Sequence, residues 1–458
     1  MLLGTQRVND RNHLEIGGCD VVDLAAEFGT PLYVMDEQAI RERCRAYKAA
    51  FASEYGGAAI AYAGKAFLVA AMCVLADQEG MWLDAASAGE LFTAVRAGFP
   101  TERVLLHGNF KSPEELEMAV EHGVGFVVVD SLGELELLGA ICQNSGLTQR
   151  ILLRVNPGVD PHTHRLISTG QEDSKFGFNI RNGSAMQAAR LALETEGIDL
   201  AGVHCHVGSQ LLDTTPFVEA APVMAKFVRA VLDETGQELE YLDVGGGLGV
   251  RYLEEHDPPS IEKLAKAVSE AVIVAAAQEG IRKPKLILEP GRSIVGEAGT
   301  TIYSIGPIKT VGIPEPPGER TYLSVDGGLS DNPRPALYDA LYSAIIANKA
   351  GDPPATTYRV SGKHCETDLL IPSLALPEAR TGDLLAVQTT GAYNHSMASN
   401  YNRFTRPAVV FVADGRADLV ARRETLDDVV RLDVLPERLR CRAGADAGAR
   451  PPVTTKEQ

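Results

Sequence analysis

Several polar side chains stand directly after short apolar runs, where they could do chemistry together. Lys65 follows the run 58–63, and apolar residues come after it as well. Burial in apolar surroundings lowers the pKa of a lysine and makes its amine a nucleophile suited to a Schiff base. Taken alone, Lys65 is more simply read as an ion-paired or snorkelling lysine, so its interpretation depends on its neighbours.

Two further strand ends could bind an anion. Gly245–Gly247, with Gly249 after it, can expose backbone N–H groups to a phosphate, although a lone glycine loop is often only a tight turn. Glu289 begins a turn in which Arg292 can aim its guanidinium at a phosphate or carboxylate. A buried Glu289 needs a cation or a proton donor, which a pyridinium nitrogen would supply, unless it simply pairs with Arg292.

The segment 204–209 offers a third kind of group. His204 and His206 share one face of a strand, so Cys205 points the other way. His206 could stack on a flat cofactor ring, and Ser209 could bind a phosphate. Two histidines on one face also suggest a metal, but no third ligand follows at a suitable spacing, so we expect none.

These groups form one set if they meet in space. A Schiff-base lysine, a glycine cradle, an arginine and a carboxylate are the groups that pyridoxal 5′-phosphate uses. The joint pattern predicts that cofactor more strongly than any single residue does.

The elements that carry these residues alternate regularly. Eight short apolar runs each end at a polar or glycine-rich stop, with helical patterns such as 113–122, 184–195, 216–235 and 261–279 between them. This alternation predicts a closed (β/α)8 barrel, whose active site lies at the C-terminal ends of its strands. The predicted strands are at 59–63, 81–83, 104–106, 126–129, 151–153, 202–205, 239–242 and 286–288.

The pattern changes near residue 300. Short β-rich runs at 301–304, 320–325, 357–360, 383–388 and 408–412 are separated by Gly/Pro turns and predict a second, mainly antiparallel β-domain. Residues 1–35, with Val21, Val22 and 31–34, are expected to add a strand to it. We therefore expect a barrel over 36–300, the β-domain over 301–438 and a disordered tail over 439–458.

Composition excludes several classes of protein. The chain has 458 residues, 45% of them hydrophobic and 23% charged, which is typical of a globular protein. Its net charge of −18 argues against binding to nucleic acid or an anionic membrane surface. Seven scattered cysteines without a CxxC pair indicate a reducing, cytoplasmic setting.

Targeting and membrane segments are not expected either. The first 20 residues lack the apolar core of a signal peptide. The run 56–76 carries Lys65 near its centre, which would cost roughly 3 kcal/mol in a bilayer.

The ordered motifs together resemble the diaminopimelate decarboxylases, which belong to the barrel-type, alanine racemase-like class of pyridoxal-phosphate enzymes. The resemblance runs from about residue 29 to 431. It is carried by the segments 61–66 (AYAGKA), 107–112 (HGNFKS), 154–159 (RVNPGV), 174–177 (SKFG), 204–210 (HCHVGSQ), 289–292 (EPGR), 331–335 (DNPRP), 362–366 (GKHCE) and 391–393 (GAY).

The resemblance implies a role for each matching residue. Lys65 corresponds to the lysine that attaches the cofactor, His206 to the histidine that stacks on its ring, and Glu289 to the partner of its pyridine nitrogen. Cys365 corresponds to an acid that assists protonation after carbon dioxide leaves. A homodimer is implied, because in this family the Cys365–Glu366 loop reaches the neighbouring subunit's site. The remaining cofactor-binding set is Ser209, Gly246, Gly247, Gly291, Arg292 and Tyr393, and the substrate-binding set is Arg292, Arg334, Tyr338, Glu366 and Tyr393.

The implied substrate, meso-diaminopimelate, suits these side chains. Arg292 and Arg334 can pair with the carboxylate that is kept, and Glu366 can pair with the distal ammonium. One departure concerns the loop after Glu366: many members continue Ser-Gly-Asp, whereas this chain has the shorter Thr367-Asp368.

Three alternatives stay open at this point. The first is a sister decarboxylase acting on ornithine, arginine, lysine or carboxynorspermidine; most of these substrates would leave Arg334 without a carboxylate partner. The second is an amino-acid racemase on the same barrel, and the third is a catalytically silent cofactor-binding relative. The presence of both Lys65 and Cys365 argues against the third.

Overall fold

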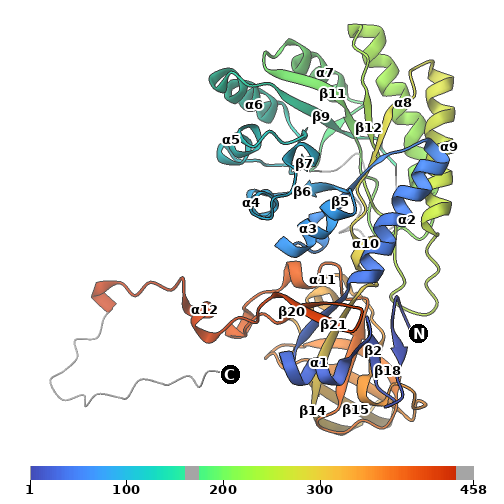
Figure 1. Cartoon of the computed structure of the whole chain (residues 1–458), viewed down its shortest axis with the longest axis vertical. Coiled ribbons are helices and arrows are strands. Elements are labelled where there is room, and N and C mark those ends of the chain that lie inside the picture. The colour runs from blue at the N-terminus through green and yellow to red at the C-terminus, as the bar shows by residue number, and fades with distance from the viewer. Residues whose placement is uncertain (1, 160–174, 440–458) are drawn as a thin grey trace.

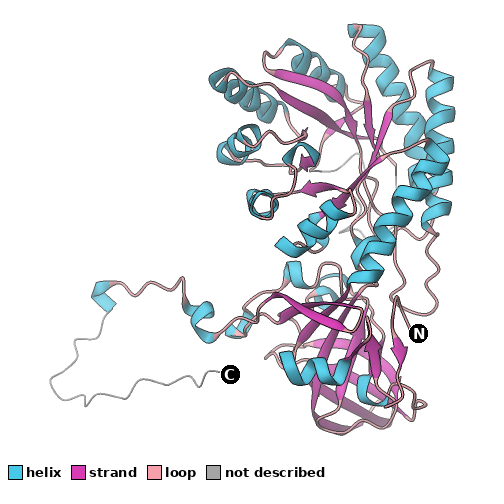
Figure 2. Ribbon diagram, viewed as in Figure 1, coloured by secondary structure: helices cyan, strands magenta, loops and turns pink. Residues whose placement is uncertain are grey.

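The computed structural model describes residues 2–159 and 175–439. A barrel of strands ringed by helices lies at one end of the molecule, and a β-rich domain lies at the other (Figure 1). Figure 2 shows the division by secondary structure: helices alternate with strands in the upper half, and strands dominate the lower half. The predicted fold class, a (β/α)8 barrel with a mainly antiparallel β-domain, is confirmed.

The eight barrel strands lie where the sequence predicted them. They are β5 (Ala59–Ala63), β6 (Trp82–Ala85), β7 (Val104–Leu106), β8 (Phe126–Val129), β9 (Gln149–Asn156), β11 (Ile198–His204), β12 (Tyr241–Asp243) and β13 (Lys285–Leu288). All neighbours pair in parallel, and β13 closes the barrel onto β5 with Ile287 opposite Ala59. β10 (Phe178–Asn179) adds to β9 beside the barrel.

Helices connect the strands and cover the barrel. The predicted helices are confirmed, and their ends follow from local residues: Ser112 caps α5 in a capping box with Glu115, and Pro113 stands in its first turn. The helices of this part are α2 (Glu37–Tyr55), α3 (Ala70–Gln78), α4 (Ala88–Arg96), α5 (Pro113–Glu121), α6 (Leu132–Ser145), α7 (Ser184–Glu194), α8 (Thr215–Thr235), α9 (Ile261–Glu279) and α10 (Arg292–Val295).

Alternate residues of the barrel strands enter two different cores. Ile60, Leu106 and Val127 pack with the helices in the large outer core. Their neighbours along the strands pack with one another across the interior, because successive side chains of a strand point to opposite faces. This inner cluster consists of Ala61, Leu105, Phe126, Val128, Leu152, Ala201 and Ile287.

The β-domain surrounds a second core and takes in the N-terminal region. Its strands are β4 (Leu32–Asp36), β14 (Gly299–Ile313), β15 (Gly318–Val325), β16 (Ala344–Ile346), β17 (Thr356–Ser361), β18 (Leu369–Leu376), β19 (Leu384–Gln388), β20 (Ala408–Ala413) and β21 (Arg416–Ala421). The order is β18-β17-β15-β14-β4-β20-β21, with β19 between β14 and β16. The five predicted β-rich runs all fall in strands, whereas β16, β18 and β21 were missed.

One expectation about the N-terminal region is wrong. Val21 and Val22 begin α1 (Val21–Phe28) instead of a strand, while β1 (Arg7–Val8), β2 (Leu14–Ile16) and β3 (Cys19–Asp20) form a small sheet before it. The Asp20 side chain caps the helix by accepting from the Val22 N–H, and Val21 and Leu24 bury one face. Cap and helical spacing outweigh the β-propensity of the valine pair.

We propose the domain limits given above, with a barrel over 36–300 and a β-domain formed by 1–35 and 301–438. β4 supports them, because it pairs with β14 and β20 and its last residue, Asp36, caps α2. The β-domain also contains two short helices, α11 (Arg334–Tyr338) and α12 (Leu426–Val430). A helical turn at Glu437–Leu439 follows α12, and residues 440–458 of the expected tail lie outside the described residues.

No helix within residues 2–159 and 175–439 is long and apolar enough to cross a membrane. The apolar run 56–76 is divided among β5, the turn Gly64–Ala66 and α3.

The inner cluster generates a prediction about stability. Leu152 has no exposed surface, so Leu152→Ala should leave a cavity and lower the free energy of unfolding by about 2–5 kcal/mol. Urea unfolding followed by the fluorescence of Trp82, the sole tryptophan, reports on this region because Trp82 packs against the cluster. Leu419→Ala, at an exposed position, is the control; an equal effect of both changes would refute the packing argument.

Candidate active site

A cavity of about 220 Å³ lies where the C-terminal ends of the barrel strands face the β-domain. It brings together residues that are far apart in the sequence, from β5, β11, β12, β13 and the β-domain. The predicted site residues that line it are Lys65, His206, Ser209, Gly247, Glu289, Gly291, Arg292, Arg334, Tyr338 and Tyr393. Gly246, Cys365 and Glu366 do not line it.

Lys65 projects into this cavity and pairs with a carboxylate. Its Nζ lies 2.8 Å from Oδ2 of Asp84, the polar stop of β6, and its side chain stays 44% exposed. The expected lowered pKa is therefore wrong for this state of the protein. Burial lowers the pKa of Lys65, but Asp84, Tyr393 and Glu289 outweigh it, so that the pKa is raised above its usual value.

The glycine loop after β12 allows close approach of backbone. A Cβ on Gly246 would lie 2.0 Å from the carbonyl oxygen of Glu289, and a Cβ on Gly247 would lie 2.4 Å from that of Gly208. Gly247 also has φ +134°, which L side chains rarely adopt. Gly247 lines the cavity, whereas Gly246 packs the loop against the segment after β13.

Two guanidinium groups face the cavity. Arg292 donates to Tyr252 OH at 2.5 Å and to Ser209 Oγ at 3.1 Å, and Arg334 donates to Tyr342 OH at 3.0 Å. Both lie over the ring of Tyr393, at 4.8 and 5.7 Å from its centre. Within the described part of the chain neither is paired with a carboxylate, so the expected alternative of a Glu289–Arg292 pair is not formed.

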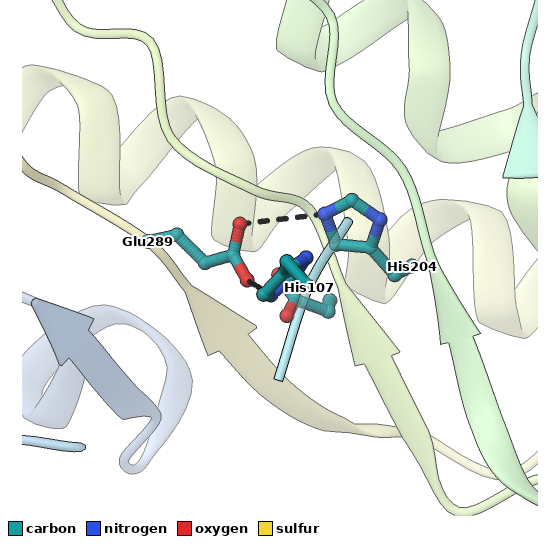
Figure 3. A group of neighbouring side chains, drawn as sticks. His107, His204 and Glu289 are labelled. Carbon is teal, nitrogen blue, oxygen red and sulfur yellow. Dashed lines mark hydrogen bonds and ion pairs between the residues drawn. The ribbon is translucent and has the colours of Figure 1, made fainter. Parts of the chain in front are cut away.

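Glu289 instead meets histidines. Its carboxylate lies 2.6 Å from His107 Nε2 and 3.3 Å from His204 Nε2 (Figure 3). Together with Asp243 these residues offer four buried metal-ligand atoms within 4.8 Å of one another. The sequence analysis considered His204 with His206 as metal ligands and found no third ligand near them. The group in the structure leaves out His206 and combines residues at the ends of β7, β11, β12 and β13, which lie far apart in the sequence.

His206 lines the cavity as a neutral ring. Burial lowers the pKa of His206 well below its usual range, and the charges of Lys65 and Arg154 lower it further. A neutral imidazole beside Lys65 can stack on a flat ring without adding a positive charge to the cavity.

Cys365 and Glu366 are exposed on the loop between β17 and β18. Asp368 closes this loop at its base: its carboxylate lies 2.5 Å from His364 Nδ1 and accepts from the Leu329 N–H at 2.9 Å. The Glu366 carboxylate accepts a hydrogen bond from Tyr401. The shorter Thr367-Asp368 sequence therefore still forms a closed loop, which presents Cys365 and Glu366 outward.

Four residues of the site were not singled out from the sequence: Asp84, His107, Asp243 and Tyr252. The first three follow or end apolar strands, and His107 also begins the family segment 107–112. Tyr252 lies in a long connection after β12, where no pattern in the sequence marked it.

The residues of the cavity fit pyridoxal phosphate. Arg292 Nε is buried and has no hydrogen-bond partner among residues 2–159 and 175–439, so it can donate to a phosphate oxygen beside Ser209 and the glycine loop. Lys65 supplies an amine, His206 a neutral ring, and Glu289 a buried carboxylate. The amine, the imidazole ring, the carboxylate and the guanidinium match the cofactor's aldehyde, ring, ring nitrogen and phosphate, in that order.

The Lys65–Asp84 pair generates a prediction. Asp84 stabilises the ammonium form, so Asp84→Asn should lower the pKa of Lys65, by on the order of one to three units in cofactor-free protein. At a given alkaline pH more amine is then neutral, and acetylation of Lys65 should be faster. The rate of acetylation of Lys65 is measured by mass spectrometry of competitively labelled protein over a range of pH. Asp130→Asn, a buried carboxyl near Arg154, is the control; unchanged labelling in Asp84→Asn would contradict the ion pair.

Comparisons with known proteins agree with this site. Residues 37–296 match the family described as "Pyridoxal-dependent decarboxylase, pyridoxal binding domain". The diaminopimelate decarboxylase of Bacillus subtilis is 50% identical over 94% of this chain and 98% of its own length. The diaminopimelate decarboxylase of Mycobacterium tuberculosis is 45% identical over 92% and 94%.

A solved structure is similar throughout. The crystal structure of diaminopimelate decarboxylase from M. jannaschii in complex with L-lysine has a TM-score of 0.89 and 36% identity, covering 96% of this chain and 100% of that one. The chain therefore belongs to the diaminopimelate decarboxylase family of pyridoxal-dependent decarboxylases.

Proposed function

We propose that this chain removes one carboxylate from meso-2,6-diaminopimelate to give L-lysine and carbon dioxide, the last step of lysine biosynthesis, with pyridoxal 5′-phosphate as cofactor. The observation that carries this proposal is the presence in one cavity of Lys65 and two arginines, Arg292 and Arg334, that have no carboxylate partner among the described residues. One arginine suits the cofactor's phosphate, and the second suits a carboxylate that the substrate keeps.

The cavity residues have distinct roles toward the cofactor. When bound, it supplies a conjugated ring that takes up the electron pair left by the departing carboxylate. Lys65 attaches and releases it, His206 packs on its ring, and Glu289 holds a proton at its pyridine nitrogen. Its phosphate would be held among Ser209, Gly247, Gly291, Arg292 and Tyr393, and Gly246 would let the loop behind them pack closely.

The distal end of the substrate must be bound by a charged group that is held in a fixed direction. Arg334 is held by Tyr342 and by the ring of Tyr338, 5.3 Å from its guanidinium carbon, so it approaches the substrate in a fixed direction. A bidentate arginine–carboxylate pair discriminates against diamines that lack this carboxylate, because the buried guanidinium would lose its partner.

Cys365 and Glu366 act on a second copy of the chain in this proposal. Both are exposed and lie outside the cavity of their own chain, so a homodimer would bring them to the partner's Lys65. Cys365 as a thiol would then donate the proton that replaces the carboxylate, and Glu366 would pair with the distal ammonium. The site would thus be complete only at an interface.

We also propose a cytoplasmic setting. The described cysteines are Cys19, Cys44, Cys73, Cys142, Cys205 and Cys365, and all are free thiols. Cys365 can act as an acid only while it stays reduced, which a reducing compartment ensures.

Product analysis tests the reaction. Carbon dioxide and L-lysine should form from meso-diaminopimelate, and not from ornithine, arginine or lysine. Arg334→Met keeps an unbranched apolar side chain but removes the charge, and it should lower kcat/KM about 10- to 150-fold, since a charged hydrogen bond contributes about 1.5–3 kcal/mol. Carbon dioxide from a monocarboxylate diamine would overturn the substrate and leave the cofactor assignment intact.

Mixing one inactive variant with one slow variant tests the shared site. Lys65→Ala should lose the visible absorbance that a covalently attached cofactor gives, and Cys365→Ala should keep that absorbance but turn over slowly. Random reassociation of the two should restore about a quarter of the sites, because half of the dimers then carry one site with both residues. No recovery after verified exchange of subunits would refute the shared site.

A further inference from the structure

One imidazole in the β-domain joins two segments that serve the site. His364 stands directly before Cys365 and Glu366 on the loop between β17 and β18. Its side chain has no exposed surface, although Cys365 beside it is exposed. The ring stacks on Tyr401, with 5.9 Å between ring centres, and meets Phe404 edge to face at 5.0 Å. Both nitrogens of a buried imidazole need hydrogen-bond partners, and these partners identify the segments that the ring connects.

The hydrogen bonds of the ring fix which nitrogen carries its proton. The backbone N–H of Ser330 donates to Nε2 of His364 at 3.3 Å, so Nε2 is an acceptor without a proton. The proton of the ring is therefore on Nδ1, which lies 2.5 Å from Oδ2 of Asp368 and donates to it. His364 thus bonds on one side to the turn before α11 and on the other side to the carboxylate at the base of its own loop.

The carboxylate of Asp368 ties the same two segments together. Its Oδ1 accepts from the Leu329 N–H at 2.9 Å, and its Oδ2 accepts from the His364 N–H at 3.2 Å in addition to the imidazole. Two glycines make room for it, because a Cβ on Gly328 or on Gly362 would lie 2.0 Å from Oδ2. The carboxylate is thus enclosed by backbone of both segments, and displacing either segment breaks one of its bonds.

The turn that donates these bonds leads directly into the cavity. It spans residues 328–332, and the N–H groups of Asp331 and Asn332 both donate to the carbonyl of Gly328, at 3.0 and 2.7 Å. α11 begins two residues later with Arg334, which lines the cavity. Because the turn is short and mostly buried, its position fixes where α11 begins and how Arg334 approaches the substrate.

The loop on the other side of the ring carries the residues that act on a second copy of the chain in the proposed function. Tyr401, on which His364 stacks, donates a hydrogen bond to the Glu366 carboxylate. The Asp368 N–H also donates to the Glu366 carbonyl, at 2.8 Å. Displacing the imidazole would therefore move Cys365 and Glu366 together.

We propose that His364 is a positioning residue for two sites at once: it holds Arg334 in the cavity of its own chain and presents the Cys365–Glu366 loop to the cavity of the partner. The proposal rests on the proposed function, because it takes the roles of these residues from there. It gives His364 no contact with substrate or cofactor. Loss of the ring should change KM through one segment and kcat through the other, and it should leave the cofactor attached to Lys65.

A matched pair of variants separates the two hydrogen bonds of the ring. His364→Gln can place an oxygen where Nε2 accepts from Ser330, and His364→Asn can place an N–H where Nδ1 donates to Asp368. The glutamine variant should keep KM for meso-diaminopimelate and lose about five- to tenfold in kcat, which is the size expected for one hydrogen bond. The asparagine variant should keep kcat and raise KM by about the same factor.

The comparison within this pair isolates the hydrogen bonds, because both variants lose the stacked ring. Equal changes of KM and kcat in the two variants would overturn the proposal. Visible absorbance of the attached cofactor should persist in both, and its loss would show that His364 acts on the cofactor instead. His122→Gln, at an exposed position, is the control and should change neither constant.

Mixed dimers test whether the two effects reach different chains. His364→Phe keeps a ring and removes both hydrogen bonds, so KM should rise and kcat should fall, each about five- to tenfold. After reassociation with a roughly tenfold excess of Lys65→Ala, about nine in ten of its chains lie in mixed dimers. The one working cavity of such a dimer takes Arg334 from the variant chain and the Cys365–Glu366 loop from the other chain. There kcat should return to within about twofold of the unchanged protein, while KM stays raised.

The mixture can contradict the proposal in two ways. A kcat that stays low would show that His364 does not set the loop for the partner, and a KM that returns to normal would show that it does not set Arg334 in its own chain. The mixture of Lys65→Ala with Cys365→Ala distinguishes the causes, because recovery there but not here refutes the role of His364 alone. If the unchanged protein releases no carbon dioxide from meso-diaminopimelate, the proposed function itself is refuted.

Discussion

Closure of the barrel is the constraint on which the rest of the site depends. β13 pairs with β5, and this pairing brings Glu289 and Lys65 to the same end of the barrel although they are far apart in the sequence. All eight strands run in parallel, so each strand delivers its C-terminal polar residue to the same end. The apolar interior, including Leu152 and Ile287, fills the barrel below and keeps this end fixed.

Some charged side chains at the mouth of the barrel are paired with an opposite charge, and others are not. Lys65 is paired with Asp84, and Glu289 is paired with His107 and His204. Arg292 and Arg334 have only hydroxyl and ring partners in the described chain. Buried charges need a partner of opposite sign. The cavity therefore favours an anion beside Arg292 and Arg334 and a cationic nitrogen beside Glu289.

The β-domain completes the site in two ways. It supplies Arg334, Tyr338 and Tyr393 to the cavity of its own chain. It also presents Cys365 on a loop that Asp368 closes through His364 and the backbone of Leu329. The contacts that close this loop involve its two ends, His364 and Asp368, and not its middle.

The sequence by itself determined the barrel, the helices α5, α7, α8 and α9, and ten of the residues that line the cavity. Apolar runs with polar stops are local patterns, and the family motifs mark the same positions. Only the tertiary structure decided the α1 helix at Val21, the ion pair of Lys65 and the grouping of Glu289 with His107, His204 and Asp243. The physical reason is that a pKa depends on burial and on charges a few ångströms away, and the partners Asp84, His107 and Asp243 come from separate strands that only barrel closure brings together.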